Sequence, residues 1–329
     1  MNKYNKETIR SFAVLLTALL ILPFLSQAQQ YDKEDLILRN RIGQMFIAGF
    51  RGEELKSEST IYKLITQNNI GGVILFDYDV PSKGKKERNI ASPQQLKRLC
   101  EELQKAASYH LFISIDQEGG MVSRLKEKYG FPPTVSAEFL GNNNKSNITS
   151  SYATRTADLL QSLGINLNFA PCVDVNINPN NPIIGSIERS FSSNPDIVIR
   201  NARIWIEEAR KKGIISAIKH FPGHGSSTKD SHKGMVDVSA TYDSTEMKPF
   251  RELIAENVVD MVMTSHIFNS KFDKDYPATM SYRTLTNILR VQMGFRGVIV
   301  SDDMAMGAIA KEYALEYALQ KAIEAGVNM

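Results

Sequence analysis

Cysteine is scarce in this sequence: its 329 residues include only Cys100 and Cys172, and tryptophan occurs once, as Trp205. Cys100 falls in a helical pattern and Cys172 in an apolar, strand-like run, where lone cysteines usually act as small buried hydrophobic residues. We therefore expect no disulfide, which excludes a fold held together by disulfide bridges. Trp205 also lies in a helical pattern, and we expect it to pack in the core.

The chain also lacks an apolar run long enough to cross a membrane. Residues 11–24 form an apolar run of about 14 residues, whereas a transmembrane helix needs roughly 20. Lys3, Lys6 and Arg10 make a basic start before this run, and Ser26–Ala28 make a small-residue cleavage site after it. The pattern favours a secretory signal peptide over residues 1–28 rather than a membrane anchor. We expect an exported protein, periplasmic or secreted, with no stable membrane insertion.

Neither sign of charge is in excess. The chain has 39 Lys and Arg against 36 Asp and Glu, a formal charge of +3. Removal of residues 1–28 would take away three basic residues and one acidic residue, and would leave +1. Nucleic-acid surfaces depend on a concentration of positive charge. We therefore expect no nucleic-acid partner.

Residues 29–329 repeat one pattern: a short apolar run, a turn, and then a longer segment with helical periodicity. Such runs are typical of strands in a parallel sheet with both faces covered. The predicted strands are Met45–Phe50, Gly72–Phe76, Leu111–Asp116, Asn166–Pro171, Ile215–His220, Asp260–His266 and Gly297–Asp302. The predicted helices include Gln94–Ala107, Ser151–Leu163, Pro195–Lys212, Met247–Glu256 and Thr284–Met293.

About eight such units make a (β/α)₈ TIM-like barrel, the fold class that we predict for a single catalytic domain over residues 29–329. An eighth run begins at Gly326 and stops at Met329. We therefore expect the barrel to be truncated in its eighth strand and incomplete at the C-terminus. A doubly wound open sheet is the alternative fold. Two polar segments, Asp77–Ser92 and Gly141–Ser150, are predicted to be solvated loops.

The reactive side chains gather where the predicted strands end, which is where the active sites of barrels lie. They are Asp116, Asp174, Lys219, His220, His266, Asp302 and Asp303. Asp302 follows an apolar strand, so its carboxylate should face the barrel mouth, where it could attack an electrophilic carbon. A helix-capping role for Asp302 is the alternative. We expect Asp303 to cap the next helix.

A glycine-punctuated loop carries three histidines, over residues 219–232 (KHFPGHGSSTKDSH). His220 and His224 are four residues apart, but Pro222 and Gly223 prevent the helix that would direct both at one metal ion. We predict no metal site, and keep a zinc site made by the three histidines as an alternative. Asp230 can hydrogen-bond to one nitrogen of His232 and leave the other free to exchange protons, although both could simply be solvated.

At the KHFPGHG…DSH loop and the SDD segment, the sequence resembles the bacterial β-N-acetylhexosaminidases of glycoside hydrolase family 3. The similarity runs from about Arg41 to Met329 and includes Gly71–Phe76, Asp116–Gly120 and Arg189–Phe191. The resemblance implies that Asp302 is the nucleophile, His232 the acid/base and Asp230 its partner. It assigns sugar binding to Asp116, Arg124, Arg189, Lys219 and His220, with His266 a weaker candidate. It implies no cofactor.

The implied reaction is the release of terminal non-reducing β-N-acetylglucosamine by a retaining mechanism, through a covalent glycosyl-enzyme on Asp302. The expected partner is a glycan or muropeptide that contains N-acetylglucosamine. Whether the substrate is a peptidoglycan fragment, a chitin-like oligomer or a host glycan stays open, because variable loops build the outer subsites. A family 3 β-glucosidase and a non-catalytic glycan-binding barrel are the alternative functions.

Overall fold

The computed structural model describes residues 33–80, 82–86 and 88–329. The predicted signal peptide lies outside the described residues. Among the helices that are described, none combines the length and the apolar character needed to cross a membrane.

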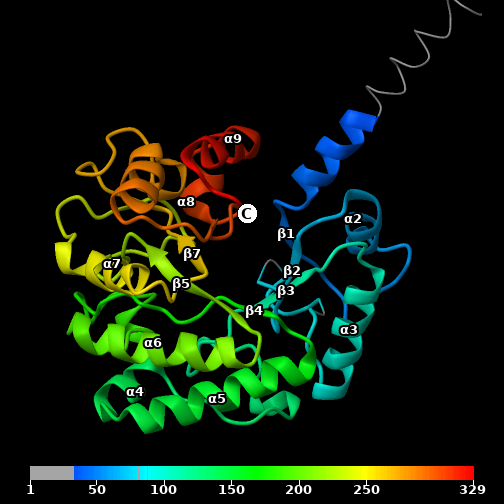
Figure 1. Ribbon diagram of the computed structural model, residues 1–329, viewed down its shortest axis with the longest axis horizontal. Helices are drawn as coiled ribbons and strands as arrows, with labels where there is room; N and C mark the ends of the chain where they lie inside the picture. The colour runs from blue at the N-terminus through cyan, green and yellow to red at the C-terminus, as the bar shows by residue number, and fades with distance from the viewer. Residues whose placement is uncertain (1–32, 81, 87) are drawn as a thin grey trace, which may run out of the picture.

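Seven parallel strands form one curved sheet, in the order β1-β2-β3-β4-β5-β7-β9 (Figure 1). Their bounds are β1 Ile47–Gly49, β2 Gly72–Leu75, β3 Phe112–Ile115, β4 Leu167–Asn168, β5 Ile215–Phe221, β7 Met261–Thr264 and β9 Val298–Val300. All seven predicted strands are confirmed. The neighbours follow the chain order without the reversal that defines a doubly wound sheet, so the alternative fold is wrong.

The two ends of the sheet approach each other. The N–H of Asn328 donates to the carbonyl of Ile299 in β9, and the carbonyl of Met329 accepts from the N–H of Ser301. The Met329 side chain packs in one apolar cluster with Ile47 of β1. In Figure 1 the C-terminus accordingly lies beside β1. The sheet is therefore curled in the manner of a TIM barrel.

Helices cover the outside of the sheet. They are α2 Thr60–Asn68, α3 Pro93–Ala106, α5 Ser146–Leu163, α6 Pro195–Lys211, α7 Lys248–Ala255, η5 Arg283–Gln292 and α9 Leu315–Ala325. Most predicted helices are confirmed within a few residues. η5 is a π-helix, which the sequence did not indicate because apolar spacings of three and four do not separate it from an α-helix.

One predicted loop is mostly helical. Gly141–Ser150 contains the end of α4 (Ala137–Asn143) and the start of α5, and only Asn144 and Lys145 separate them. Asn144 ends α4 in the left-handed conformation, at φ 53°. Asparagine tolerates this conformation. The Asn-rich composition therefore marks a tight junction between two helices rather than a long loop. Asp77–Ser92 is a loop, but Asp79 within it is fully buried.

The single tryptophan and the two cysteines are all buried in the apolar core. Trp205 of α6 is buried in the larger core cluster. Cys100 and Cys172 are both buried free thiols, which confirms that they form no disulfide. Inside the curve, Leu167, Ala217 and Met261 belong to a smaller cluster that fills the barrel interior.

Shorter elements lie in the connections. They are η1 Glu127–Tyr129, η2 Gly185–Ile187, β6 Val236–Asp237, η3 Ser244–Met247, β8 Ile267–Phe268, η4 Ala278–Met280 and α8 Gly307–Ala310. β6 and β8 pair in parallel as a second small sheet. These elements lie in the segments that follow β3, β4, β5, β7 and β9, from which the site is built.

Candidate functional site

A buried ion cluster joins the ends of β3 and β5. Lys219 of β5 is 1% exposed, and its Nζ lies 2.8 Å from Asp116 Oδ1 and 2.6 Å from Glu118 Oε1. Arg189 donates to both oxygens of Glu118, at 2.9 and 2.7 Å. Arg124 lies 3.3 Å from Asp116. The structure thus brings together four of the predicted sugar-binding residues with Glu118, to which the sequence assigned no role.

The charges in this cluster stabilise one another. Burial alone would raise the pKa of Asp116, but Lys219 and Arg124 outweigh it and hold this pKa well below the ordinary value. Burial likewise opposes ionisation of Glu118, yet Arg189 and Lys219 lower its pKa to about 2. Both carboxylates are therefore ionised at neutral pH and can accept hydrogen bonds from hydroxyl groups.

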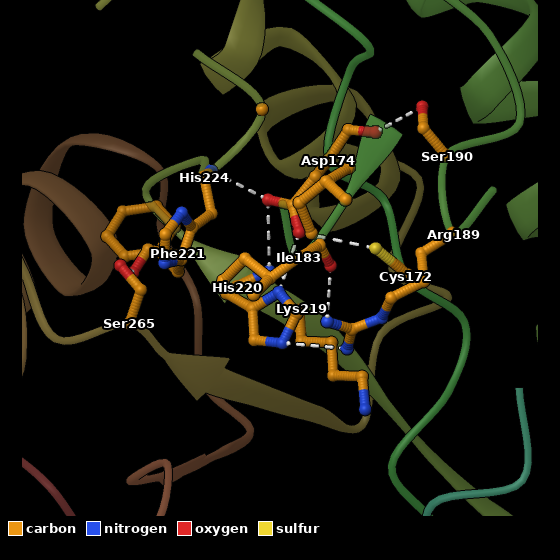
Figure 2. A network of polar contacts seen from close by, with 12 residues as sticks. Cys172, Asp174, Ile183, Arg189, Ser190, Lys219, His220, Phe221, His224 and Ser265 are labelled. Atoms are coloured by element: carbon orange, nitrogen blue, oxygen red, sulfur yellow. Dashed lines mark hydrogen bonds and ion pairs between the residues drawn. The ribbon is translucent and has the colours of Figure 1, made fainter. Parts of the chain in front are cut away.

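His220, also in β5, lies between the carboxylate of Asp174 and the guanidinium of Arg189 (Figure 2). Its Nδ1 is 2.6 Å from Asp174 Oδ2, and its Nε2 is 3.2 Å from Nη2 of Arg189. Asp174 is fully buried, and although burial opposes its ionisation, the hydrogen bonds from His220 and from the backbone N–H of His224 hold its pKa below the ordinary value. His220 thereby links the ion cluster to Asp174.

His224 is directed away from this cluster. Its Nδ1 lies 2.6 Å from Ser227 Oγ and its Nε2 lies 3.3 Å from Ser231 Oγ. Burial lowers its pKa to about 4, so the ring is neutral at physiological pH. Since the nitrogens of His220 and His224 are all engaged with other partners, the three-histidine zinc site is not assembled here.

Within the described residues, one group of side chains could bring three donors to a metal ion: Cys172, Asp174 and His220, whose donor atoms lie within 4.8 Å of one another. The thiol and the imidazole both contact Asp174 Oδ2 already. A metal ion on Nδ1 of His220 would also move the ring proton to Nε2, against the N–H groups of Arg189. The residues present therefore do not fit a metal ion without rearrangement.

Asp302 follows β9 and is half-buried. Burial would raise its pKa, but the neighbouring imidazoles of His266 and His220, the N–H of Asp303 and the ammonium of Lys219 more than offset this and lower the pKa. Its Oδ1 accepts the N–H of Asp303 at 2.8 Å. Asp302 is therefore ionised at neutral pH and lies near Lys219 and His220 at the end of β5.

His266 is buried, and both of its nitrogens have partners. Nε2 lies 3.0 Å from the carbonyl oxygen of Asp303, and Nδ1 lies 2.9 Å from Thr279 Oγ1. Burial lowers its pKa. Through its contact with the carbonyl of Asp303, His266 supports the turn that follows Asp302.

Asp303 does not cap a helix, which makes that prediction wrong. Its carboxylate accepts the N–H of Ala305, and its carbonyl accepts the N–H of Met306. α8 begins only at Gly307, with Met306 as its N-cap. The chain makes an extra turn before the helix, so Asp303 caps that turn instead.

His232 and Asp230 form a hydrogen-bonded pair on the loop after β5. Asp230 Oδ1 accepts from both Nδ1 of His232, at 2.8 Å, and its backbone N–H, at 2.9 Å. Burial tends to raise the pKa of Asp230, but these bonds lower it. The imidazole of His232 is 62% exposed, which leaves Nε2 open to solvent or to a ligand.

The loop with His232 is attached to the segment after Asp302. The carbonyl of His232 accepts the N–H of Gly307, and the carbonyl of Ser231 accepts the N–H of Ala308. A Cβ at Gly307 would come within 2.6 Å of the His232 carbonyl oxygen, so the close approach requires glycine. Residues 230–232 and Asp302 therefore belong to neighbouring segments of one face.

Comparison with known proteins points to one family. Residues 37–329 match the model of the glycosyl hydrolase family 3 N-terminal domain. Beta-hexosaminidase A of Pseudoalteromonas piscicida is 36% identical over 290 residues, 81% of this chain and 46% of that protein. Beta-hexosaminidase of Tolumonas auensis is 33% identical over 282 residues, 85% of this chain and 79% of that protein.

A solved structure agrees with these relatives. The family 3 beta-N-acetylglucosaminidase from Paenibacillus sp. str. FPU-7 superposes with a TM-score of 0.80 at 36% identity. The match covers 89% of this chain and 54% of that chain. This chain therefore spans about half the length of two of the relatives to which it is similar, and most of the length of another.

Proposed function

The chain belongs to glycosyl hydrolase family 3, and from this premise we propose that it is a β-N-acetylhexosaminidase that releases terminal non-reducing β-N-acetylglucosamine. The observation that carries the proposal is the buried cluster of Asp116, Glu118, Arg189, Lys219 and His220 beside the ionised Asp302. Such a cluster offers fixed charged donors and acceptors to the hydroxyl and acetamido groups of one sugar.

In the proposed reaction, Asp302 attacks the anomeric carbon while the bond from that carbon to the leaving oxygen breaks. The lowered pKa of Asp302 suits a nucleophile that must be ionised. The product of this step is a glycosyl-enzyme ester, which water then hydrolyses with release of the Asp302 carboxylate.

His232 is proposed to donate its proton to the leaving oxygen in the first step and to take one from water in the second. Asp230 holds Nδ1 of His232, so Nε2 is the nitrogen that exchanges protons. His232→Ala should slow an alkyl glycoside far more than an aryl glycoside with a good leaving group. His110→Ala, at the opposite end of the sheet, is the control, and equal slowing of both substrates by His232→Ala would remove His232 from the acid role.

The nucleophile can be tested by trapping. A fluoro-sugar that stalls the second step should add one sugar mass to the wild-type protein but not to Asp302→Ala. Asp303→Asn alters the adjacent, exposed carboxylate and should still be labelled. Labelling of Asp302→Ala would assign the nucleophile to another residue.

The decisive experiment on substrate class compares aryl N-acetylglucosaminide with aryl glucoside on the same preparation. Preferred hydrolysis of the first substrate supports the proposal, and preferred hydrolysis of the second supports a β-glucosidase. Binding of N-acetylglucosamine without hydrolysis of either would support a glycan-binding barrel.

We also propose that the protein is exported and acts on a glycan or muropeptide, as in peptidoglycan turnover. The support is the basic, apolar and small-residue order of residues 1–28. Expression of the whole chain in a bacterium, followed by fractionation and N-terminal sequencing, should find a mature protein in the periplasm or medium that begins near Gln29. A cytoplasmic protein that keeps residues 1–28 would contradict export.

A further inference from the structure

Asp174 is a fully buried carboxylate whose two oxygens accept from different groups. Oδ1 accepts two backbone N–H groups, from His224 at 2.8 Å and from His220 at 3.3 Å. Oδ2 faces the Nδ1 atom of His220 at 2.6 Å and the thiol of Cys172 at 3.2 Å. Figure 2 shows these contacts meeting at Asp174. The carboxylate therefore joins β5 to the start of the histidine loop.

The partner of His220 on its other side defines where the ring proton lies. Nε2 of His220 is 3.2 Å from Nη2 of Arg189, and a guanidinium can only donate hydrogen bonds. Nε2 must therefore be the acceptor, and the proton must lie on Nδ1, where it is donated to Asp174. His220 is thus held as a neutral imidazole of one tautomer.

The backbone carbonyl of Asp174 also helps to hold the segment that carries Arg189. The hydroxyl of Ser190 donates to the carbonyl of Asp174 at 2.6 Å. Arg189 in turn donates to Glu118 and, through Nη1, to the carbonyl of Ile183 at 2.9 Å. Each nitrogen of the guanidinium consequently has a partner among the described residues, and one of these partners is His220 Nε2. A change of tautomer at His220 would replace this acceptor by a second donor.

We propose that Asp174 is a positioning residue that holds the proton of His220 on Nδ1, so that Nε2 of His220 keeps Arg189 in place for sugar binding. The tautomer and the contact with Arg189 stand on the geometry alone, whereas the sugar-binding consequence rests on the proposed function.

Asp174→Asn gives a sharp test because the backbone dictates how the amide must turn. The two N–H groups at Oδ1 require an acceptor there, so the amide oxygen takes that position and the NH₂ group takes the position of Oδ2. The NH₂ group then faces Nδ1 of His220 and makes it an acceptor. The proton moves to Nε2, where it opposes the N–H groups of Arg189.

The tautomer can be read by ¹⁵N NMR of protein labelled at histidine, with His220→Gln used to identify the His220 signals. The wild type should carry the proton on Nδ1 of His220, and Asp174→Asn should carry it on Nε2. With an aryl N-acetylglucosaminide, Asp174→Asn should raise KM by about 10- to 100-fold, the change expected when a hydrogen bond to a charged group is lost, and should change kcat much less.

Cys172→Ala is the matched control, because it removes the other donor to Oδ2 and leaves His220 in place. It should keep the wild-type tautomer and the wild-type KM. Two results would overturn the proposal: a wild-type His220 that is protonated on Nε2, which needs no variant, or a tautomer change in Asp174→Asn that leaves KM unaltered. Failure of the wild type to hydrolyse the glycoside would instead refute the proposed function, since the NMR result does not depend on turnover.

Discussion

At the scale of single residues, the charge balance of the site depends most on Lys219. Its ammonium group is buried and contacts both Asp116 and Glu118. Burial opposes its protonation, but these two carboxylates raise its pKa above the ordinary value. Without this cation the two carboxylates would retain, among the described residues, the cationic partners Arg124 and Arg189 in a poorly hydrated environment. A single ammonium thus compensates two acids that burial would otherwise tend to neutralise.

We expect Lys219→Met to lower the free energy of unfolding by about 3–5 kcal/mol, the range for removing one partner of a buried ion pair. Hydrolysis of an aryl N-acetylglucosaminide should fall to background, because Asp116 and Glu118 lose their shared donor. Urea unfolding and initial rates measure the two effects. Lys274→Met, on an exposed lysine, should change stability by less than about 0.5 kcal/mol. A stable and active Lys219→Met would show that the two arginines suffice.

Asp230 behaves differently from Asp174, because a single oxygen of Asp230 accepts both hydrogen bonds from His232. In Asp230→Asn the amide oxygen can occupy this position and keep both bonds, so the loss is confined to the charge and to the ion pair of Oδ2 with the exposed Lys233. We expect kcat to fall by about 10-fold in Asp230→Asn and by about 100-fold or more in Asp230→Ala. Equal losses in the two variants would mean that the charge of Asp230, rather than its hydrogen bonds, supports His232.

At the scale of elements, Glu246, a buried residue of η3, supports the loop after β5 through hydrogen bonds. Oε2 of Glu246 accepts the N–H of Ser226, and Oε1 accepts the N–H of Asp243. A Cβ at Gly223, where φ is +123°, would lie 2.6 Å from Cβ of Glu246, so only glycine allows this approach. Burial raises the pKa of Glu246 to about 7.

The raised pKa makes the stability of this element depend on pH. The folded state binds the proton more tightly than the unfolded chain, whose pKa is near 4.5. The stabilisation that comes from protonation of Glu246 is therefore complete below about pH 4.5 and is lost as the pH rises to about 7. The free energy of unfolding should fall by about 3 kcal/mol over this range. Glu246→Gln removes this dependence, although glutamine gives up one of the two backbone hydrogen bonds at every pH.

The difference in unfolding free energy between wild type and Glu246→Gln should therefore shift in favour of the variant between pH 4.5 and pH 8. Urea titrations at several pH values measure it. Glu312→Gln removes an exposed carboxyl and should show no comparable shift. A wild type and a Glu246→Gln variant with parallel pH profiles would mean that Glu246 is ionised in the folded protein without penalty.

The elements also show what the sequence could predict. The strands were predictable because buried parallel strands are almost entirely apolar, as in Val298–Val300. The junction at Asn144 was not, because its conformation is a property of the backbone. Lys219 and Arg189 were predicted from family resemblance. The sequence places Asp174 just after a predicted strand, but its contact with His220, 46 residues away, depends on the fold and cannot be read from local spacing.

At the scale of the whole molecule, the curled sheet connects the last residues of the chain to the position of Asp302. Oδ1 of Asn328 accepts the N–H of Ile299 at 2.9 Å and a guanidinium N–H of Arg290 at 2.6 Å. Together with the bond from Ser301 to Met329, these contacts order β9 up to the residue before Asp302. The backbone near the C-terminus thus supports the residue proposed as the nucleophile.

Asn328→Ala removes two side-chain hydrogen bonds, one of them to a charged group, and should lower the unfolding free energy by about 1–2 kcal/mol. One of the two lost bonds holds the backbone N–H of Ile299 in β9, the strand that leads to Asp302. We therefore expect kcat/KM to fall as well, although Asn328 lies away from the ion cluster. Thermal or urea unfolding and initial rates measure both effects, with the exposed Asn147→Ala as control. If Asn328→Ala lost stability but kept full activity, the position of Asp302 would depend on the turn supported by His266 rather than on the contacts between Asn328 and β9.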